Sequence, residues 1–405
     1  MKQSHDVLII GGGFVGASLA IALGQNGINV GLVESSSSRS LSPVFDQRHL
    51  VFAAASMQAL TQLGVAPFFA NAATSIQRVH ISQAGHLGCV ELVSAQHGCP
   101  SFGSVVLACA FGHALDQRLQ QITTLTRYRP FTCVGLGDVR DGWRSVHIVS
   151  SEQNDDARDI RARLVVGCDG TYSTVRDLLQ IRTEEHDYRQ TLALSQVQLH
   201  HPPDGTAWER FGASGPTALL PRVDGRFGVI HCFESTHRHA MEHCETAAWI
   251  RVLQKAIGWR HGRILHAGER HFYPLRQVVA AATCGQRAVI MGNAAQTIHP
   301  IGAQGFNLGL RDALTLAELI QVSSHDPGAD NLLSKYQQRR AVDRSQTIAF
   351  SYGLAHLTSY RGVIAWLARS AGFMYIAHQR WLQALIASES MGFRGDVPYI
   401  CRGRL

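Results

Sequence analysis

Hydrophobic and polar positions divide the chain into a first part that mixes strands with helices and a last part that is mostly helical. Residues 6–34 predict a buried strand, a glycine turn, a helix of small residues and a second strand. A helical pattern follows from about 50 to 65, another covers 112–122, and a series of strands covers 127–170. From about residue 308 onward, most of the pattern has the helical period.

Two stretches, residues 76–106 and 187–275, alternate apolar and polar positions instead. Such alternation is typical of antiparallel strands with one solvated or ligand-facing side. We therefore predict an α/β fold in which a Rossmann-like nucleotide-binding domain carries an inserted, mostly antiparallel sheet domain and a helical C-terminal region. The expected segments are 1–75, 107–182 and 276–325 for the nucleotide-binding domain, 76–106 and 183–275 for the sheet domain, and 326–405 for the helical region.

Charge and cysteine usage exclude several classes of protein. The formal charge is +7, but no run of five Lys or Arg occurs, so we expect no nucleic-acid binding. Nine scattered cysteines without a C-x-x-C pair favour reduced thiols in a cytosol, with no disulfide framework and no metal site. No apolar run reaches the roughly 18 residues that a membrane span needs. Residues 363–377 come closest to such a run, but Arg369 and Ser370 interrupt them. We predict that they form a packed helix, and a helix on a membrane surface is the alternative.

The first candidate site is the glycine turn between the first strand and the first helix. Gly11, Gly13 and Gly16 form a G-x-G-x-x-G pattern: the first permits the tight turn, the second admits a pyrophosphate, and the third lets helix and strand pack closely. The helix N-terminus supplies N–H groups for phosphates. Glu34 ends the second strand, where a carboxylate can hold a ribose hydroxyl. These features together predict a dinucleotide site.

Two later segments can complete such a site. Residues 169–176 follow an apolar strand and offer a second phosphate or ribose contact, with Arg176 opening the next helix. Residues 292–312 combine four glycines with amide side chains, and Gly302 and Gly305 would let a flat ring approach the backbone. A site built from both ends of the chain implies a long cofactor, and FAD fits this demand better than NAD.

These three motifs, in this order, resemble those of the FAD-dependent aromatic hydroxylases. Residues 292–312 resemble the branch of that family that acts in ubiquinone biosynthesis. Further segments resemble the 2-octaprenyl-6-methoxyphenol hydroxylases of this branch, and they are residues 208–211, 215–221, 258–268 and 273–275. The resemblance covers roughly residues 5–320.

The resemblance implies a monooxygenase. NADH or NADPH would reduce FAD, the reduced flavin would form a hydroperoxide with O2, and the ring of a polyprenylated phenol would be hydroxylated. A polyprenyl tail is poorly soluble in water. The resemblance therefore also implies a cytoplasmic enzyme that meets its substrate peripherally at the inner membrane surface, or through partner proteins of ubiquinone biosynthesis.

Residue roles follow from the same resemblance, position by position. The implied cofactor contacts are Gly11, Gly13, Phe14, Val15, Gly16 and Glu34 for the ADP half, Arg48 near the flavin, Asp169 and Gly170 at the pyrophosphate, and Asn293, Pro300, Gly302, Gln304, Gly305, Phe306 and Asn307 along the ribityl chain and ring. No catalytic acid or base is assigned. The candidates beside the ring are His299, Pro300 and Gln304, and we expect His299 to shape the pocket.

Several positions depart from the family pattern. Asn293 stands where most members have Asp, and Gln296 stands where they have His. Gly302-Ala303 reverses the more usual Ala-Gly order, which adds a methyl group near the ring. His113-Ala114 replaces an amide residue followed by Arg, which puts one flavin contact in doubt.

Other functions stay open on the sequence alone. The chain could be a sister hydroxylase of the same pathway or could act on a small soluble aromatic acid. Arg or Tyr side chains clustered in the pocket would favour the acid, whereas an apolar tunnel would favour the prenylated phenol. A further alternative is a flavin-binding assembly subunit that has lost turnover. The departures at Asn293 and His113-Ala114 would be consistent with such a subunit.

Overall fold

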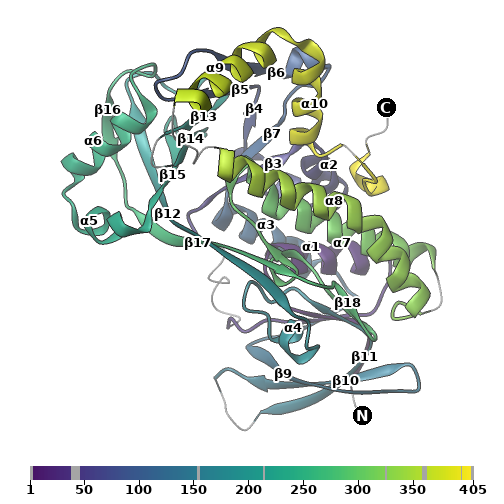
Figure 1. The fold of residues 1–405 in the computed structure, drawn as a ribbon. Helices are drawn as coiled ribbons and strands as arrows, with labels where there is room; N and C mark the ends of the chain where they lie inside the picture. The colour runs from purple at the N-terminus through teal and green to yellow at the C-terminus, as the bar shows by residue number, and fades with distance from the viewer. Residues whose placement is uncertain are drawn as a thin grey trace.

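The computed structural model describes residues 3–37, 46–152, 156–212, 215–323, 326–357, 363–393 and 395–402 of the 405-residue chain. Two large sheets and a set of C-terminal helices make up most of it (Figure 1). The predicted α/β architecture with a helical C-terminal region is confirmed.

The first sheet has the N-terminal strand near its centre. Its strands are β1 (Gln3–Ile10), β2 (Val30–Val33), β8 (Leu125–Tyr128), β11 (Ala157–Gly167), β18 (Cys284–Gly285) and β19 (Ala288–Ile290), extended beside β11 by β9 (Phe131–Arg140) and β10 (Trp143–Ser150). They run in the order β18-β19-β11-β1-β2-β8, and β19, β11, β1, β2 and β8 are parallel neighbours. Residues 7–10 are all buried, which is why this strand reads as one continuous apolar run.

Helices cover this sheet. They are α1 (Phe14–Gly24), α3 (Ala108–Gln120), α4 (Thr174–Leu178), α7 (Gln304–Val322) and α8 (Asp330–Leu357). In α1 every residue from 16 to 24 is buried, because the helix packs against the sheet, α3 and α7 (Figure 1). Leu308, Ala313 and Leu316 of α7 face the core, and α7 begins at Gln304, earlier than the sequence pattern suggested.

The second sheet forms the inserted region. Its strands are β5 (Arg78–Gln83), β6 (Cys89–Val93), β12 (Thr183–Leu199), β13 (Thr206–Phe211), β14 (Pro216–Pro221), β15 (Phe227–Glu234), β16 (Ile264–Ala267), β17 (His271–Ala280) and β20 (Gln296–Thr297). They run in the order β20-β17-β12-β15-β14-β13-β5-β6, with β16 beside β12. Every pair is antiparallel except β13 with β5.

Two local predictions need correction. The stretch 187–275 was read as strands, but it also contains α5 (Arg238–His243) and α6 (Thr246–Ile257). Trp249, Leu253 and Ile257 form one buried stripe of α6 against the sheet, which is helical spacing. The helix predicted from about 50 begins later, because β3 (His49–Ala53) forms a small sheet with β7 (Gly103–Leu107) and β4 (Thr74–Ile76), so that α2 covers only Ala54–Gln62.

The C-terminal region continues with α9 (Val363–His378) and α10 (Arg380–Met391), which lie across the inserted sheet on the side opposite α6 (Figure 1). Phe373, Ile376 and Met391 pack there against Val90 and Leu92 of β6. Within the described residues, no helix is long and apolar enough to cross a membrane. We call the side of the sheet that carries α9 and α10 the inner face, and the side that carries α6 the outer face.

Candidate functional site

The glycine turn lies where the ends of β1 and β11 approach each other. Gly11 has φ of 103° and donates its N–H to the Val33 carbonyl at 2.9 Å. A Cβ on Gly11 would lie 2.5 Å from the Cys168 carbonyl oxygen, and one on Gly16 would lie 2.0 Å from the Gly11 carbonyl oxygen. Neither contact is possible, so both glycines are needed for the fold itself.

Gly13 is different, because its own backbone does not require glycine. It has φ of −66° and ψ of −172° and stands at the N-terminal end of α1, where no described side chain caps the helix and no acidic residue occupies the first turn. The first N–H groups of α1 therefore lack intrahelical partners and can bind an anionic ligand. This fits the pyrophosphate of a dinucleotide, and the predicted role of Gly13 remains one of leaving room.

Glu34 faces the same turn from the end of β2. One carboxylate oxygen accepts the Gly12 N–H at 2.9 Å and the other accepts the Ser36 N–H at 3.0 Å. The side chain is nearly buried. These bonds fix the carboxylate beside the helix N-terminus, where the predicted ribose contact would have to form.

The loop after β11 connects the glycine turn with residues 292–312, which we call the late segment. The Asp169 carboxylate accepts the Ser173 hydroxyl at 2.5 Å and the Val175 N–H at 3.1 Å, so both oxygens hold the start of α4. Burial raises the pKa of Asp169. Arg176 is buried and donates to the Thr171 and Ala294 carbonyls at 2.9 and 3.1 Å. The sequence placed Arg176 only at a helix start, whereas the structure makes it the link between the two loops.

The late segment turns sharply before α7. Gly302 has φ of 68° and Ala303 has φ of 52°, so two consecutive residues are left-handed immediately before α7. A left-handed non-glycine residue costs roughly 1–2 kcal/mol. The reversed Gly302-Ala303 order thus places a methyl group on a strained backbone position. As in α1, the first turn of α7 has neither an acidic residue nor a described capping side chain, which leaves N–H groups for a ligand.

His299 positions this turn. It is 1% exposed, its Nδ1 accepts the Ile301 N–H at 3.2 Å, and its Nε2 lies 3.3 Å from the Gln190 side-chain oxygen. Burial lowers the pKa of His299 to about 4, so the ring is neutral near pH 7. This geometry agrees with a role in shaping the pocket, and Pro300, which follows it, begins the turn.

Two of the residues expected along the flavin are used inside the protein. The Asn307 side chain donates to the Val51 and Ala303 carbonyls and accepts from the Ala53 N–H and the Ser56 hydroxyl, at 2.7 to 3.0 Å. Phe306 belongs to an aromatic cluster that joins α1, β3, α3 and α7. Its members are Phe14, Phe52, Phe69, Phe111 and Phe306. Sequence reasoning missed the cluster, since its members are spread over the chain.

The other predicted positions differ in their exposure. Asn293 and Gly302 are exposed, Val15 and Gly305 are partly exposed, and Gln304 is nearly buried. A Cβ on Gly170 would meet nothing within 4 Å. His113 is exposed and Ala114 is buried on α3.

Arg48 reaches toward the inner face of the inserted sheet. Its Nε donates to Asp46 at 2.9 Å, and its guanidinium lies 5.7 Å from the centre of the Tyr273 ring. The Tyr273 hydroxyl donates to Asp46 at 3.2 Å. These contacts join the loop before β3 to β17.

Gln296, which departs from the family pattern, belongs to a buried polar network. Its amide nitrogen donates to Asp312 at 2.8 Å, and its oxygen accepts from Arg344 at 2.8 Å. Asp312 also accepts from Arg340 at 2.6 Å, and all of Gln296, Asp312 and Arg340 are at most 3% exposed. The network fastens the late segment to α7 and α8.

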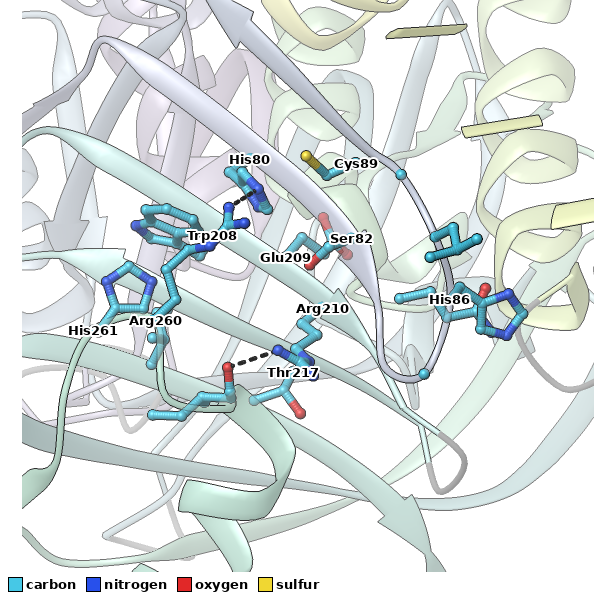
Figure 2. Close-up of a pocket in the computed structure, with 16 residues that line it drawn as sticks. His80, Ser82, His86, Cys89, Trp208, Glu209, Arg210, Thr217, Arg260 and His261 are labelled. Atoms are coloured by element: carbon cyan, nitrogen blue, oxygen red, sulfur yellow. Dashed lines mark hydrogen bonds between the residues drawn. The ribbon is translucent and has the colours of Figure 1, made fainter. Parts of the chain in front are cut away.

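A separate pocket of about 330 Å³ lies beside α6 (Figure 2). Trp208, Arg260 and His261 line it, and the Arg260 guanidinium lies over the Trp208 ring and contacts His80. Burial lowers the pKa values of His80 and His261 to about 4. None of the residues expected to hold the cofactor lines this pocket.

The fold and the site define a flavin-dependent aromatic hydroxylase. The chain belongs to the family described as FAD binding domain, whose profile matches residues 4–351. It is 29% identical over 391 residues to the ubiquinone hydroxylase UbiL of Rhodospirillum rubrum, covering 96% of this chain and 89% of that protein. It is 28% identical over 357 residues to the 3-demethoxyubiquinol 3-hydroxylase of Escherichia coli, covering 84% of this chain and 87% of that protein.

A solved structure confirms the fold class. The p-nitrophenol 4-monooxygenase PnpA of Pseudomonas putida superposes with a TM-score of 0.80 at 17% identity, covering 98% of this chain and 99% of that one. The predicted resemblance to FAD-dependent hydroxylases of ubiquinone biosynthesis and the predicted FAD cofactor are thus confirmed. The roles of individual residues remain predictions.

Replacing Gly13 by Val tests the predicted pyrophosphate contact. Gly13 has a backbone conformation that Val can adopt, so the variant should fold but purify without bound flavin. Flavin absorbance per protein and the circular dichroism spectrum measure the two effects. Gly353→Ala, at a site where a Cβ meets nothing within 4 Å, is the control. A folded Gly13→Val protein with normal flavin content would refute the contact.

Replacing Asp312 by Ala tests the buried network. Arg340 would lose one of its two carboxylate partners while buried, and breaking such a pair costs about 3–5 kcal/mol. The midpoint of urea unfolding should fall clearly. Asp396→Ala removes a half-exposed partner of Arg339 and should change stability by about 1 kcal/mol or less. Equal midpoints for both variants would contradict the role of the network.

Proposed function

We propose that this enzyme hydroxylates the ring of a polyprenylated phenol, 2-octaprenyl-6-methoxyphenol or a close analogue, in ubiquinone biosynthesis. NADH or NADPH would serve as reductant and O2 as co-substrate. Two relatives that this chain matches over most of their length are named as a ubiquinone hydroxylase and a 3-demethoxyubiquinol 3-hydroxylase, and these names support the pathway. The observation that carries the proposal is the apolar character of the inner face beside Arg48 and the late segment.

On this inner face, apolar side chains predominate near the predicted flavin contacts. Leu192, Leu194, Cys232 and Leu275 form a buried cluster, against which Tyr273 packs. Arg48, which contacts Tyr273, is already paired with Asp46. An apolar wall with a paired guanidinium suits a neutral phenol with a hydrocarbon tail better than a small aromatic acid.

Bound FAD would supply the redox chemistry, in which NAD(P)H, O2 and a proton are consumed and the ring gains one oxygen atom while water is released. The chain's own residues provide the setting. The uncapped N-termini of α1 and α7 can hold negative charge. The neutral His299 fixes the turn before α7, and the apolar cluster excludes water from the ring.

Cells that lack this protein test the proposal through their quinone intermediates. We expect 2-octaprenyl-6-methoxyphenol to accumulate and ubiquinone to fall, measured by liquid chromatography and mass spectrometry. The wild-type chain should restore ubiquinone, and a flavin-free variant should not. Accumulation of a later intermediate would assign a sister step, and unchanged ubiquinone would contradict the pathway.

The same proposal requires access to a lipid-soluble substrate, and the outer sides of α9 and α10 are suited to a membrane surface. Leu367, Tyr375, Trp381 and Leu385 are 55%, 57%, 62% and 40% exposed. The opposite sides of these helices pack on the inserted sheet through Phe373, Ile376, Ala387 and Met391, so each helix has apolar side chains on its outer side as well. A surface helix of a globular protein normally has one polar side.

Charge selects the occupant of this surface. In sequence, α9 and α10 contain Arg369 and Arg380 and a single acidic residue, Glu389. Exposed aromatic and aliphatic side chains combined with basic residues are typical of helices that bind anionic lipid surfaces. We therefore assign the outer sides of α9 and α10 to the anionic membrane surface.

Vesicle binding tests this assignment. The FAD-loaded enzyme should sediment with vesicles that contain phosphatidylglycerol and much less with pure phosphatidylcholine. Replacing both Trp381 and Leu385 by Ser should weaken binding about tenfold or more, because buried apolar area is lost. Trp259→Ser removes a 72% exposed Trp near α6 and is the control. Equal binding by both variants, or a dimer that hides this surface, would contradict the assignment.

A further inference from the structure

The pocket beside α6, which we call the outer pocket, is built where the chain turns back after this helix. Gly258 has φ of 78° and makes the turn, so that the next residues lie against β13. The His261 ring lies 4.0 Å from the ring of Trp208, and the Arg260 guanidinium lies 5.7 Å from it. The ring of His80 on β5 lies 4.4 Å from Trp208. These side chains surround a cavity of about 330 Å³ (Figure 2).

Two arginines line the outer pocket, and neither forms an ion pair with a carboxylate in the part of the chain that the structure describes. Arg210 donates to the Ile257 carbonyl at 3.2 Å, and Arg260 donates to Nε2 of His80. Burial lowers the pKa of Arg210, and the positive charge of Arg260 lowers it further. Two guanidiniums that share a site without an anion repel each other in this way.

The acidic residues nearby do not neutralise these arginines. Glu209 lines the pocket, but burial raises its pKa to about 7, whereas an adjacent guanidinium would lower it. Asp204 is close enough to affect the pKa of His261, but its carboxylate pairs with Arg78. Glu91 on β6 is exposed and does not line the pocket. The two positive charges therefore remain available to a ligand.

Three side chains of the same lining carry buried nitrogen atoms that lack a hydrogen-bond partner among the described residues. These atoms are Nδ1 of His80, Nε1 of Trp208 and Nε of Arg210. His80 is 4% exposed, and because its Nε2 accepts from Arg260, its Nδ1 carries the proton. The indole and guanidinium nitrogens are always donors. Since buried donors in proteins are normally satisfied, the pocket calls for a ligand that is rich in acceptors.

The size and the apolar part of the outer pocket define the ligand further. A water molecule takes up about 30 Å³ of the liquid, so a cavity of about 330 Å³ has room for more than a bare phosphate ion. Leu219 and Ile257, which are 2% and 6% exposed, line it and can contact an organic group. Two guanidiniums match the charge of about −2 on a phosphate monoester better than the single charge of a carboxylate.

We propose that the outer pocket binds a phosphate monoester of a small organic molecule. Arg210 and Arg260 bind the phosphate group, and the N–H groups of His80 and Trp208 donate to its oxygens. The residues expected to hold FAD do not line this pocket, so the site is distinct from that of the flavin. Two sources share this chemistry, namely the 2′-phosphate of NADPH and a separate phosphorylated metabolite. The proposal does not depend on which substrate the enzyme hydroxylates.

The test titrates phenyl phosphate into the FAD-loaded enzyme and measures the dissociation constant by isothermal titration calorimetry. Arg260→Gln should weaken binding about tenfold or more, because one of the two guanidiniums is lost. Arg263→Gln removes the same charge from an exposed position of the same segment that does not line the pocket, and it is the matched control. This control should bind phenyl phosphate as the wild-type enzyme does. Equal affinities of the two variants would overturn the proposal.

A second measurement needs no variant. The wild-type enzyme should bind phenyl phosphate about tenfold or more tightly than benzoate, which has the same ring but a single charge. Equal affinities, or no saturable binding of phenyl phosphate, would overturn the proposal.

Competition then identifies the source of the phosphate. Displacement of phenyl phosphate by NADP⁺ but not by NAD⁺ would assign the 2′-phosphate of the reductant. Displacement by neither would assign a separate metabolite, and the site stands in both cases. Displacement by both would mean that phenyl phosphate occupies a site for the part common to the two dinucleotides, which contradicts the proposal.

Discussion

Three segments far apart in the sequence have to end at the same edge of one parallel sheet. Pairing of β1 with β11, and of β11 with β19, brings the glycine turn, the Asp169 loop and the late segment together. The approach is so close that a Cβ on Gly16 would lie 2.0 Å from the Gly11 carbonyl oxygen and 3.1 Å from the Cys168 side chain. The long cofactor expected from the sequence can be held from both ends of the chain because of this contact.

Polar groups then hold the loops at this edge of the sheet in place. Arg176 bridges the Asp169 loop and the late segment, while the Gln296–Asp312 hydrogen bond ties that segment to α7 and α8. The helices α1 and α7 begin without acidic residues, so their N-termini stay available to an anionic ligand. The inserted sheet contributes a contrasting environment, because its inner face near Arg48 carries the apolar cluster of Leu192, Leu194, Cys232 and Leu275.

Much of the fold could be predicted from the sequence, because the N-terminal strands are continuous apolar runs. The glycine pattern was also informative, since the backbone leaves no room for a Cβ at Gly11 or Gly16. The helix α6 was missed, since its neighbours on both sides alternate as strands do. Gln296 looked like a departure in the flavin segment, but its hydrogen-bond partner Asp312 becomes apparent only once α7 is folded.

Isotope labelling tests whether the enzyme transfers an oxygen atom from O2 to a neutral prenylated phenol. The purified FAD-loaded enzyme would be supplied with NADH or NADPH, 18O2 and a short-chain prenylated 6-methoxyphenol, and the product analysed by mass spectrometry. We expect one 18O atom on the ring of the product, with reductant consumed in equal amount. Reductant oxidation that yields only hydrogen peroxide, or a product whose new oxygen comes from water, would contradict it.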